Sequence, residues 1–106
     1  MAIRTTEEVK KIVRDYYKLL LKAGLPLEKV FLFGSFSRGE QTEYSDIDIA
    51  VVLKEYTVDK FTTRLQLLKY SREFDAIIEP HPFLSSDFED QDQFATEILE
   101  SGIEIY

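Results

Sequence analysis

The amino-acid sequence predicts an α/β (α+β) fold, in which a small mixed β-sheet has its helices packed mainly on one side. Two long segments carry apolar residues at the spacing of an amphipathic helix. Between and after them lie short apolar runs that end at glycine or proline, which is typical of buried strands. The length of 106 residues suits one domain with a single core, and we expect residues 1–106 to form it.

The composition excludes several classes of function. The net charge of −7 and the pI near 4.7 argue against general nucleic-acid binding, because phosphate neutralisation needs a surplus of Lys and Arg. The absence of cysteine excludes disulfides, thiolate metal sites and cysteine nucleophiles. No apolar run approaches the length of a membrane span. We therefore expect a cytoplasmic protein that does not bind membranes.

The first helix is predicted to begin at a capping box formed by Thr5 and Glu8 and to end at Gly24. Apolar side chains recur along one face of this segment, namely Val9, Ile12, Val13, Tyr16, Leu19, Leu20 and Ala23. The opposite face carries a basic stripe, which consists of Lys10, Arg14, Lys18 and Lys22. We expect the stripe to be solvated, with a surface for a partner or an anionic ligand as the alternative.

Two strands are predicted to follow the first helix. Residues 30–33 form a continuous apolar run stopped by Gly34, and residues 46–53 form a second run with Asp46 and Asp48 near its start. Because side chains alternate along a strand, the two aspartates should project from the same face. Residues 35–45, between the strands, are small, polar and charged.

A second helix is predicted over residues 58–70, and a third strand should follow it. Apolar residues recur in the helical segment at Val58, Phe61, Leu65 and Leu68. We expect Phe61 to lie in the core, as for most aromatic residues here. The third strand is expected over residues 75–79.

Three further elements of the prediction concern the end of the chain. The third strand should stop at residue 79, because Pro80 and Pro82 prevent a central strand from continuing. A last helix is expected over about residues 87–99 and is stopped by Gly102. A short terminal strand is expected over residues 103–106.

The chemistry that the sequence indicates lies where the first strand ends and the second begins. Strands packed side by side bring the Gly34–Ser35 turn close to Asp46 and Asp48. Backbone amides near a glycine, together with the Ser35 hydroxyl, can approach phosphate oxygens closely, and Arg38 offers a fork-shaped donor. Two neighbouring carboxylates repel unless a cation neutralises them, and Mg²⁺ prefers such ligands. The turn should therefore hold a triphosphate, and the aspartates should hold Mg²⁺, as a pair of ions.

This stretch resembles the signature of the DNA polymerase β-type nucleotidyltransferase superfamily. Gly34-Ser35 is followed by ten residues and then by Asp46-Ile47-Asp48, with Arg38-Gly39 in between. The short chain is similar to the minimal nucleotidyltransferases (MNT), which are often paired with HEPN-domain proteins. The resemblance covers the whole chain in element order and implies the nucleotidyltransferase fold. It also implies nucleotide binding by Gly34 and Ser35 and metal binding by Asp46 and Asp48.

The resemblance further implies a third carboxylate on a later strand. Residues 72–78 resemble the family's pattern of a basic residue, an apolar residue, Asp and more apolar residues, which selects Asp75 as a metal ligand and catalytic residue. Glu79 lies four residues on and therefore on the same strand face, so either carboxylate can reach the site. We favour Asp75. His81, the only histidine, is expected to be structural or exposed, with an acid–base role as the alternative.

The function that the resemblance implies is Mg²⁺-dependent transfer of a nucleoside monophosphate from an NTP, with ATP as the expected donor. The acceptor hydroxyl is expected on a separate small helical protein, a HEPN-type toxin for which this chain is the antitoxin. AMP attached to a tyrosine would neutralise that toxin. Two alternatives remain open: a non-catalytic module that masks a partner stoichiometrically, and a small-molecule nucleotidyltransferase like the aminoglycoside-modifying relatives, completed by a homodimer.

Overall fold

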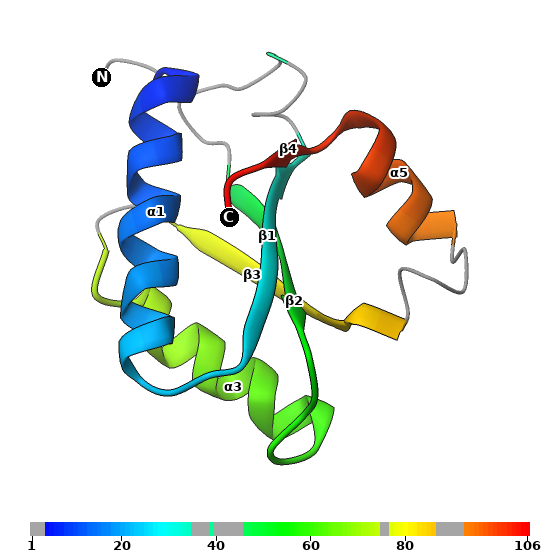
Figure 1. Cartoon of the computed structure of the whole chain (residues 1–106). Helices are drawn as coiled ribbons and strands as arrows, with labels where there is room; N and C mark the ends of the chain where they lie inside the picture. Colours follow the sequence, from blue (N-terminus) through cyan, green and yellow to red (C-terminus); the bar gives the residue numbers. More distant parts are fainter. Residues whose placement is uncertain (1–3, 35–38, 40–45, 75–76, 87–92) are drawn as a thin grey trace.

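The computed structural model describes residues 4–34, 39, 46–74, 77–86 and 93–106. The elements in chain order are α1 (Thr6–Lys22), β1 (Leu27–Phe33), β2 (Ile47–Leu53), α3 (Lys60–Ser71), β3 (Ile78–Leu84), α5 (Gln93–Ser101) and β4 (Ile103–Glu104). The four strands form one sheet in the order β3-β2-β1-β4 (Figure 1). Strand β1 is antiparallel to β2 and β4, whereas β2 and β3 are parallel, so the sheet is mixed as predicted.

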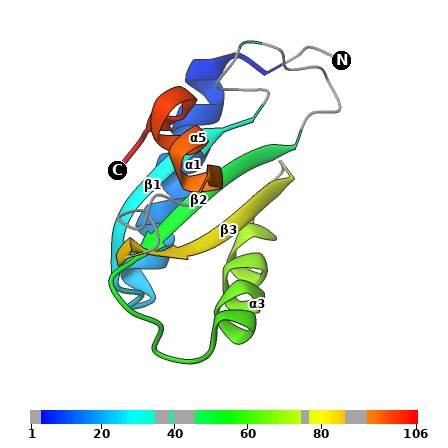
Figure 2. The ribbon, with the colours of Figure 1, turned by 90° about the vertical axis from the view of Figure 1, so that its right-hand side faces the viewer.

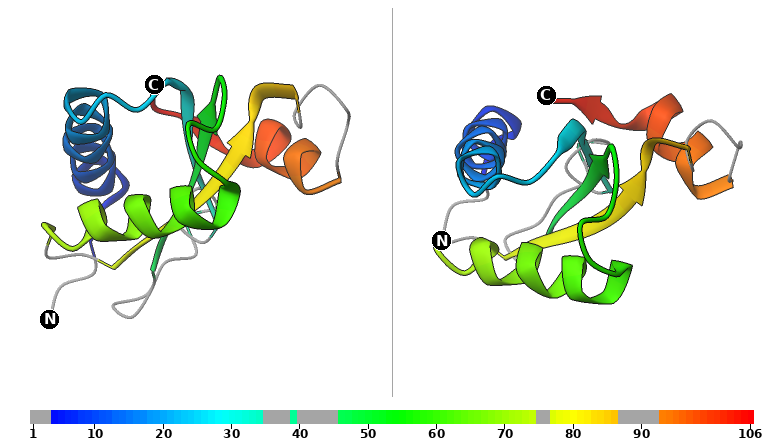
Figure 3. Two further views of the ribbon diagram at one scale, coloured as in Figure 1. Left: turned by 90° about the horizontal axis from the view of Figure 1, so that it is seen from below. Right: turned by 60° about the horizontal axis from the view of Figure 1, so that its bottom comes forward.

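Helices cover both faces of the sheet unequally. Helices α1 and α3 pack on one face and α5 lies on the other (Figure 1, Figure 3). The larger core cluster fills the α1/α3 face and consists of Val9, Val13, Tyr16, Leu20, Leu27, Val30, Leu32, Ile47, Ile49, Val51, Leu53, Leu67 and Ile78. The smaller cluster faces α5 and consists of Phe31, Ala50, Val52, Phe83 and Ile98. The prediction of helices mainly on one side is confirmed.

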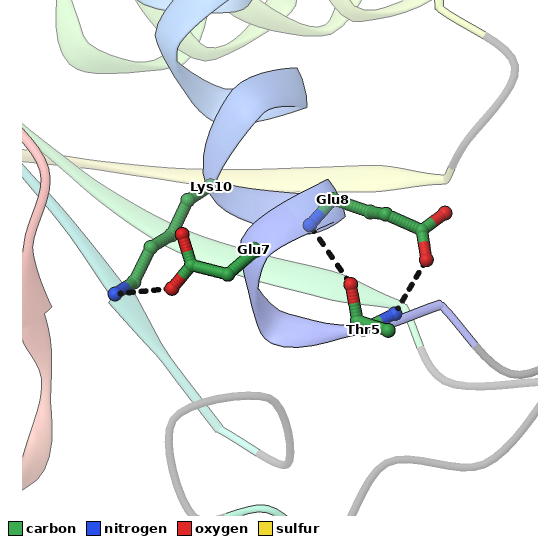
Figure 4. Close-up of polar contacts among 4 residues, drawn as sticks. All are labelled: Thr5, Glu7, Glu8 and Lys10. Atoms are coloured by element: carbon green, nitrogen blue, oxygen red, sulfur yellow. Dashed lines mark hydrogen bonds and ion pairs between the residues drawn. The ribbon is translucent and has the colours of Figure 1, made fainter.

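Helix α1 begins where the sequence predicts. The Glu8 backbone N–H donates to Thr5 Oγ1 and the Thr5 backbone N–H donates to Glu8 Oε1, both at 3.1 Å (Figure 4). These bonds satisfy amides that the first helical turn leaves without partners. Four apolar residues on one face are fully buried against the sheet and α3, namely Val9, Val13, Tyr16 and Leu20. In the same turn, Lys10 Nζ lies 3.2 Å from Glu7 Oε1 on the exposed side.

The predicted end of the third strand was wrong. Strand β3 begins at Ile78 and continues through Pro80 and Pro82 to Leu84. The strand tolerates both prolines because it lies at the edge of the described sheet. The Ile47 backbone N–H donates to the Ile77 carbonyl. In a parallel pair this register directs the N–H and C=O groups of the odd-numbered β3 residues toward β2. The prolines, which lack an N–H, therefore face away from the ladder.

Helix α3 forms where the sequence predicts, but a different face is buried. Its buried residues are Thr63, Leu67 and Ser71. Phe61 is 71% exposed and Leu65 is 50% exposed, so the expectation that Phe61 lies in the core was wrong. Phe61 and Leu65 therefore lie on the outer face of the helix, whereas Thr63, Leu67 and Ser71 lie on the face that is buried.

The last two elements close the chain against β1. Helix α5 begins at Gln93 and ends at Ser101, just before Gly102, and the predicted beginning near residue 87 lies outside the described residues. Strand β4 then pairs with β1 through Ile103 and Glu104, so the predicted terminal strand is present but ends two residues before its predicted end at residue 106. Among the described residues, no helix combines the length and hydropathy needed to cross a membrane.

We predict that Tyr16→Phe lowers the free energy of unfolding by about 1 kcal/mol. The Tyr16 hydroxyl is buried, donates to the Leu67 carbonyl at 2.7 Å and so connects α1 to α3. Urea denaturation monitored by circular dichroism measures the difference. Tyr17→Phe is the matched control, since the Tyr17 ring packs against Tyr106 and should keep its stability. An equal loss in both variants would contradict the role given to the buried hydroxyl.

Candidate active site

A row of side chains crosses three strands at one edge of the sheet. The antiparallel register places Phe33 of β1 opposite Asp48 of β2, and the parallel register places Asp48 beside Glu79 of β3. Directly opposed residues project from the same face of a sheet. The end of β1 and the beginnings of β2 and β3 meet at this edge (Figure 2). The registers therefore bring two carboxylates from different strands together.

The aspartates project away from the larger core. Ile47 and Ile49 are buried against α1 and α3, so the intervening Asp48 must turn to the other face. Asp46 lies directly before β2 and its side chain approaches Glu79. The sequence prediction that Asp46 and Asp48 share a face agrees with this placement.

Glu79 perturbs the titration of Asp46. Partial desolvation raises the pKa of Asp46 above its ordinary value, and a hydrogen bond with Glu79 and the repulsion from its charge raise that pKa further. A carboxylate–carboxylate hydrogen bond needs a shared proton, which a divalent cation can replace. The electrostatics of the site therefore favour a bound cation.

The Asp48 carboxylate occupies the space that a side chain at position 34 would need. Its φ is +76°, and a Cβ built on it would lie 2.5 Å from Asp48 Oδ2. Any side chain here would push the carboxylate aside and strain the backbone. The predicted proximity of the glycine turn to the aspartates is thus borne out for Gly34. Ser35 and Arg38, the other predicted nucleotide-binding residues, lie outside the described residues.

Three side chains of the described part of the chain form a group with metal-ligand spacing. One ligand atom from each of Asp48, Glu79 and His81 lies within 4.8 Å of the others. The two carboxylates of this group offer the oxygen ligands that Mg²⁺ and similar hard cations prefer, so they fit the metal that the sequence predicted. Asp75, predicted as the third carboxylate, lies outside the described residues. The sequence analysis placed Glu79 on this face but did not extend the alternation to His81, which follows Glu79 by two residues.

A cavity of about 290 Å³ lies away from the carboxylates. It is lined by Leu68, Ser71, Arg72, Phe74, Ile77 and Ile78, where α3 ends and β3 begins. Ile78 belongs to the core on the α1/α3 face, whereas Glu79 projects from the other face. The cavity is therefore separate from the carboxylate group.

Comparisons with known proteins agree with this geometry. A family model described as polymerase beta, nucleotidyltransferase matches residues 7–106. A relative from Methanocaldococcus jannaschii, whose name assigns it as a protein adenylyltransferase, is 43% identical over 68 residues, which cover 64% of this chain and 67% of the relative.

Two solved structures are similar in fold. A crystal structure from Sulfolobus solfataricus, named as a nucleotidyltransferase, has a TM-score of 0.65 at 21% identity and covers 93% of this chain and 80% of that one. A chain from a toxin–antitoxin crystal structure with AMP-PNP has a TM-score of 0.61 at 25% identity, covering 87% of this chain and 71% of that one. The first likeness supports the fold alone.

We predict that Gly34→Ala weakens divalent-metal binding about tenfold or more, because the new Cβ displaces Asp48. Gly24→Ala is the matched control: Gly24 has a φ of +88° and open space around its Cβ position. Both variants should lose about 1–2 kcal/mol of stability to backbone strain. Calorimetric titration with Mg²⁺ and Mn²⁺ measures the affinities, and equal affinities in the two variants would refute the steric explanation.

We predict that Asp46→Asn stabilises the metal-free protein at pH 7. Because the pKa of Asp46 is raised on folding, its ionised form disfavours the folded state, and this cost grows as the pH rises through that pKa. The gain should vanish at about pH 3, where the carboxyl is protonated in both states. Thermal melts in a chelator measure both conditions.

Asp59→Asn is the control with the opposite sign. Hydrogen bonds from Thr62 to the Asp59 carboxylate lower its pKa, so that carboxylate stabilises the fold above its unfolded-state pKa. The Asp59 variant should therefore melt lower than the wild type at pH 7 and match it in acid. A lower melting temperature for Asp46→Asn at pH 7 would refute the repulsion between Asp46 and Glu79.

Proposed function

Since this chain belongs to the polymerase beta nucleotidyltransferase family, we propose that it transfers AMP from ATP to a hydroxyl group of a partner protein. One observation carries the proposal: Asp46, Asp48 and Glu79 gather beside the Gly34 turn. The name of the M. jannaschii relative supports a protein acceptor, and the toxin–antitoxin structure with AMP-PNP supports an adenine nucleotide as donor. In this proposal the partner is a small helical toxin of the HEPN type.

The proposed reaction is an in-line displacement at the α-phosphorus of ATP. The acceptor oxygen forms a bond to the α-phosphorus, the bond from that phosphorus to the bridging oxygen breaks, and pyrophosphate leaves. The proton of the acceptor hydroxyl passes to a carboxylate of the site, for which Glu79 is our candidate. Bound divalent ions, Mg²⁺ in the first instance, supply charge stabilisation for the attacking and leaving oxygens.

Each residue of the site has a proposed role. Asp46 and Asp48 hold the metal ions, since each of their carboxylates lies close to Glu79 and the repulsion between Asp46 and Glu79 favours a cation. The backbone at Gly34 approaches the triphosphate, because that residue has no Cβ. We keep Ser35 and Arg38 as nucleotide-binding residues from their place in the motif.

We propose Glu79 rather than Asp75 as the third carboxylate. Glu79 pairs in register with Asp48 and contributes a ligand atom to the group with metal spacing. Asp75 lies outside the described residues. Register therefore favours Glu79, whereas the sequence pattern favours Asp75.

We predict that the purified chain, given ATP and Mg²⁺, adds AMP to its co-purifying or neighbouring-gene protein. Intact mass analysis of both chains detects the added mass. Asp46→Asn and Glu79→Gln should each reduce the rate of AMP transfer at least about 100-fold, because each removes a carboxylate that binds the metal or accepts the proton. Asp75→Asn should keep most of the activity.

Glu104→Gln is the control, because it removes a carboxylate that lies outside the site. Glu104 Oε1 pairs there with Lys29 Nζ at 2.5 Å. Loss of transfer in Asp75→Asn but not in Glu79→Gln would reverse the choice of third carboxylate. No added mass on a stably bound partner, although Mg²⁺ and ATP bind, would reject the transfer reaction.

The outer face of α3 favours a second candidate, stoichiometric binding of the partner without transfer. Phe61 and Leu65 are exposed there, and Val58 is exposed just before the helix begins. Exposed apolar groups that lie together often mark interaction surfaces. Pure binding should survive Asn at both Asp46 and Asp48, whereas a catalytic antitoxin should not. Neutralisation of the partner in cells by the doubly substituted chain separates the two functions.

A further inference from the structure

His81 lies in the carboxylate group, not in an unrelated part of the surface. It follows Glu79 by two residues on β3, so both side chains project from the same face. Its partner in register on β2 is Ala50, which is fully buried and small. The short alanine side chain leaves room for the imidazole to lean along the strand toward Asp48.

The position of the imidazole is defined by contacts on two sides. His81 Nε2 lies 3.6 Å from Asp48 Oδ1, and both side chains are 28% exposed. The ring packs against Phe33, with centroids 5.4 Å apart and an interplanar angle of 59°. Phe33 is the residue opposite Asp48 on β1, so it fixes the ring from the side that faces away from β3.

The distance from His81 Nε2 to Asp48 Oδ1 indicates whether the two side chains form a hydrogen bond or are spaced to bind one metal ion together. At 3.6 Å it is longer than a direct hydrogen bond between nitrogen and oxygen. Neighbouring ligand atoms on one octahedral ion lie about 3 Å apart, because each lies about 2.1 Å from the metal. Small side-chain rotations bring Asp48, Glu79 and His81 to that spacing, since their ligand atoms already lie within 4.8 Å of one another.

We propose that His81 is a direct metal ligand, which makes this centre a mixed nitrogen–oxygen site that binds Mn²⁺ more tightly than Mg²⁺. Mg²⁺ prefers oxygen ligands alone, whereas an imidazole nitrogen favours the first-row transition metals. The inference rests on the proposed function only in naming the metal of the same site, and its test does not depend on nucleotidyl transfer.

The chain offers an unusually clean spectroscopic test. His81 is the only histidine, so in a tag-free protein any imidazole coupled to a bound metal belongs to this residue. Electron spin echo measurements on bound Mn²⁺ detect the modulation from a ligating imidazole nitrogen. Growth with isotopically labelled histidine should change that modulation.

Two variants test the affinity. His81→Phe keeps a ring against Phe33 but removes the nitrogen, and His81→Gln replaces the nitrogen by an amide whose oxygen can still bind Mg²⁺. We expect both to lose Mn²⁺ affinity by about tenfold or more, while Mg²⁺ affinity, measured by competition, changes less than about threefold. Circular dichroism and thermal melts establish that each variant folds.

The outcomes are distinct. Imidazole modulation in the wild type that disappears in His81→Phe, with the selective loss of Mn²⁺ affinity, establishes the ligand. Bound Mn²⁺ without imidazole modulation, unchanged Mn²⁺ affinity in His81→Phe, or no metal binding by the wild type would each overturn the proposal. A modulation signal in a chain that transfers no AMP would leave this inference standing and reject the proposed function instead.

Discussion

Backbone pairing of β2 with β1 on one side and β3 on the other is the constraint on which the site depends. Carboxylates as close as those of Asp46 and Glu79 repel each other, so a flexible chain would let them separate. Burial of Ile47 and Ile49 fixes the rotation of β2 and leaves Asp48 no other face to occupy. The free energy gained in the core thus offsets an electrostatic cost at the edge. The backbone pairing thus holds these carboxylates close together without the help of a cation.

Local patterns predicted much of the fold. The capping box of Thr5 and Glu8 and the 3.6-residue period placed α1 correctly, because both signals depend on neighbours in sequence. The face of α3 was not predictable in the same way. Whether Phe61 or Leu67 faces the sheet depends on which elements surround the helix, and the sequence pattern alone contains no such information.

Some residues of the site could likewise be predicted from local sequence, and others could not. The closeness of Gly34 to Asp48 was predictable because β1 and β2 are consecutive in the chain and pair side by side. Glu79 and His81 come from a parallel strand beyond a crossover helix, and the register of β2 against β3 is set by tertiary packing. The rule that stopped the predicted strand at residue 79 also left His81 outside the strand, away from the face that carries Glu79. Proline excludes a strand interior only where its missing N–H would face a neighbour.

The two prolines of β3 also bear on how the chain avoids association with itself. An edge strand with free N–H groups is a template for another strand, and it invites aggregation. Pro80 and Pro82 occupy the central outward positions of β3, so the solvent side of that strand has no donors there. The described edge of the sheet therefore lacks, at these two positions, the backbone donors that would pair with a strand of another molecule.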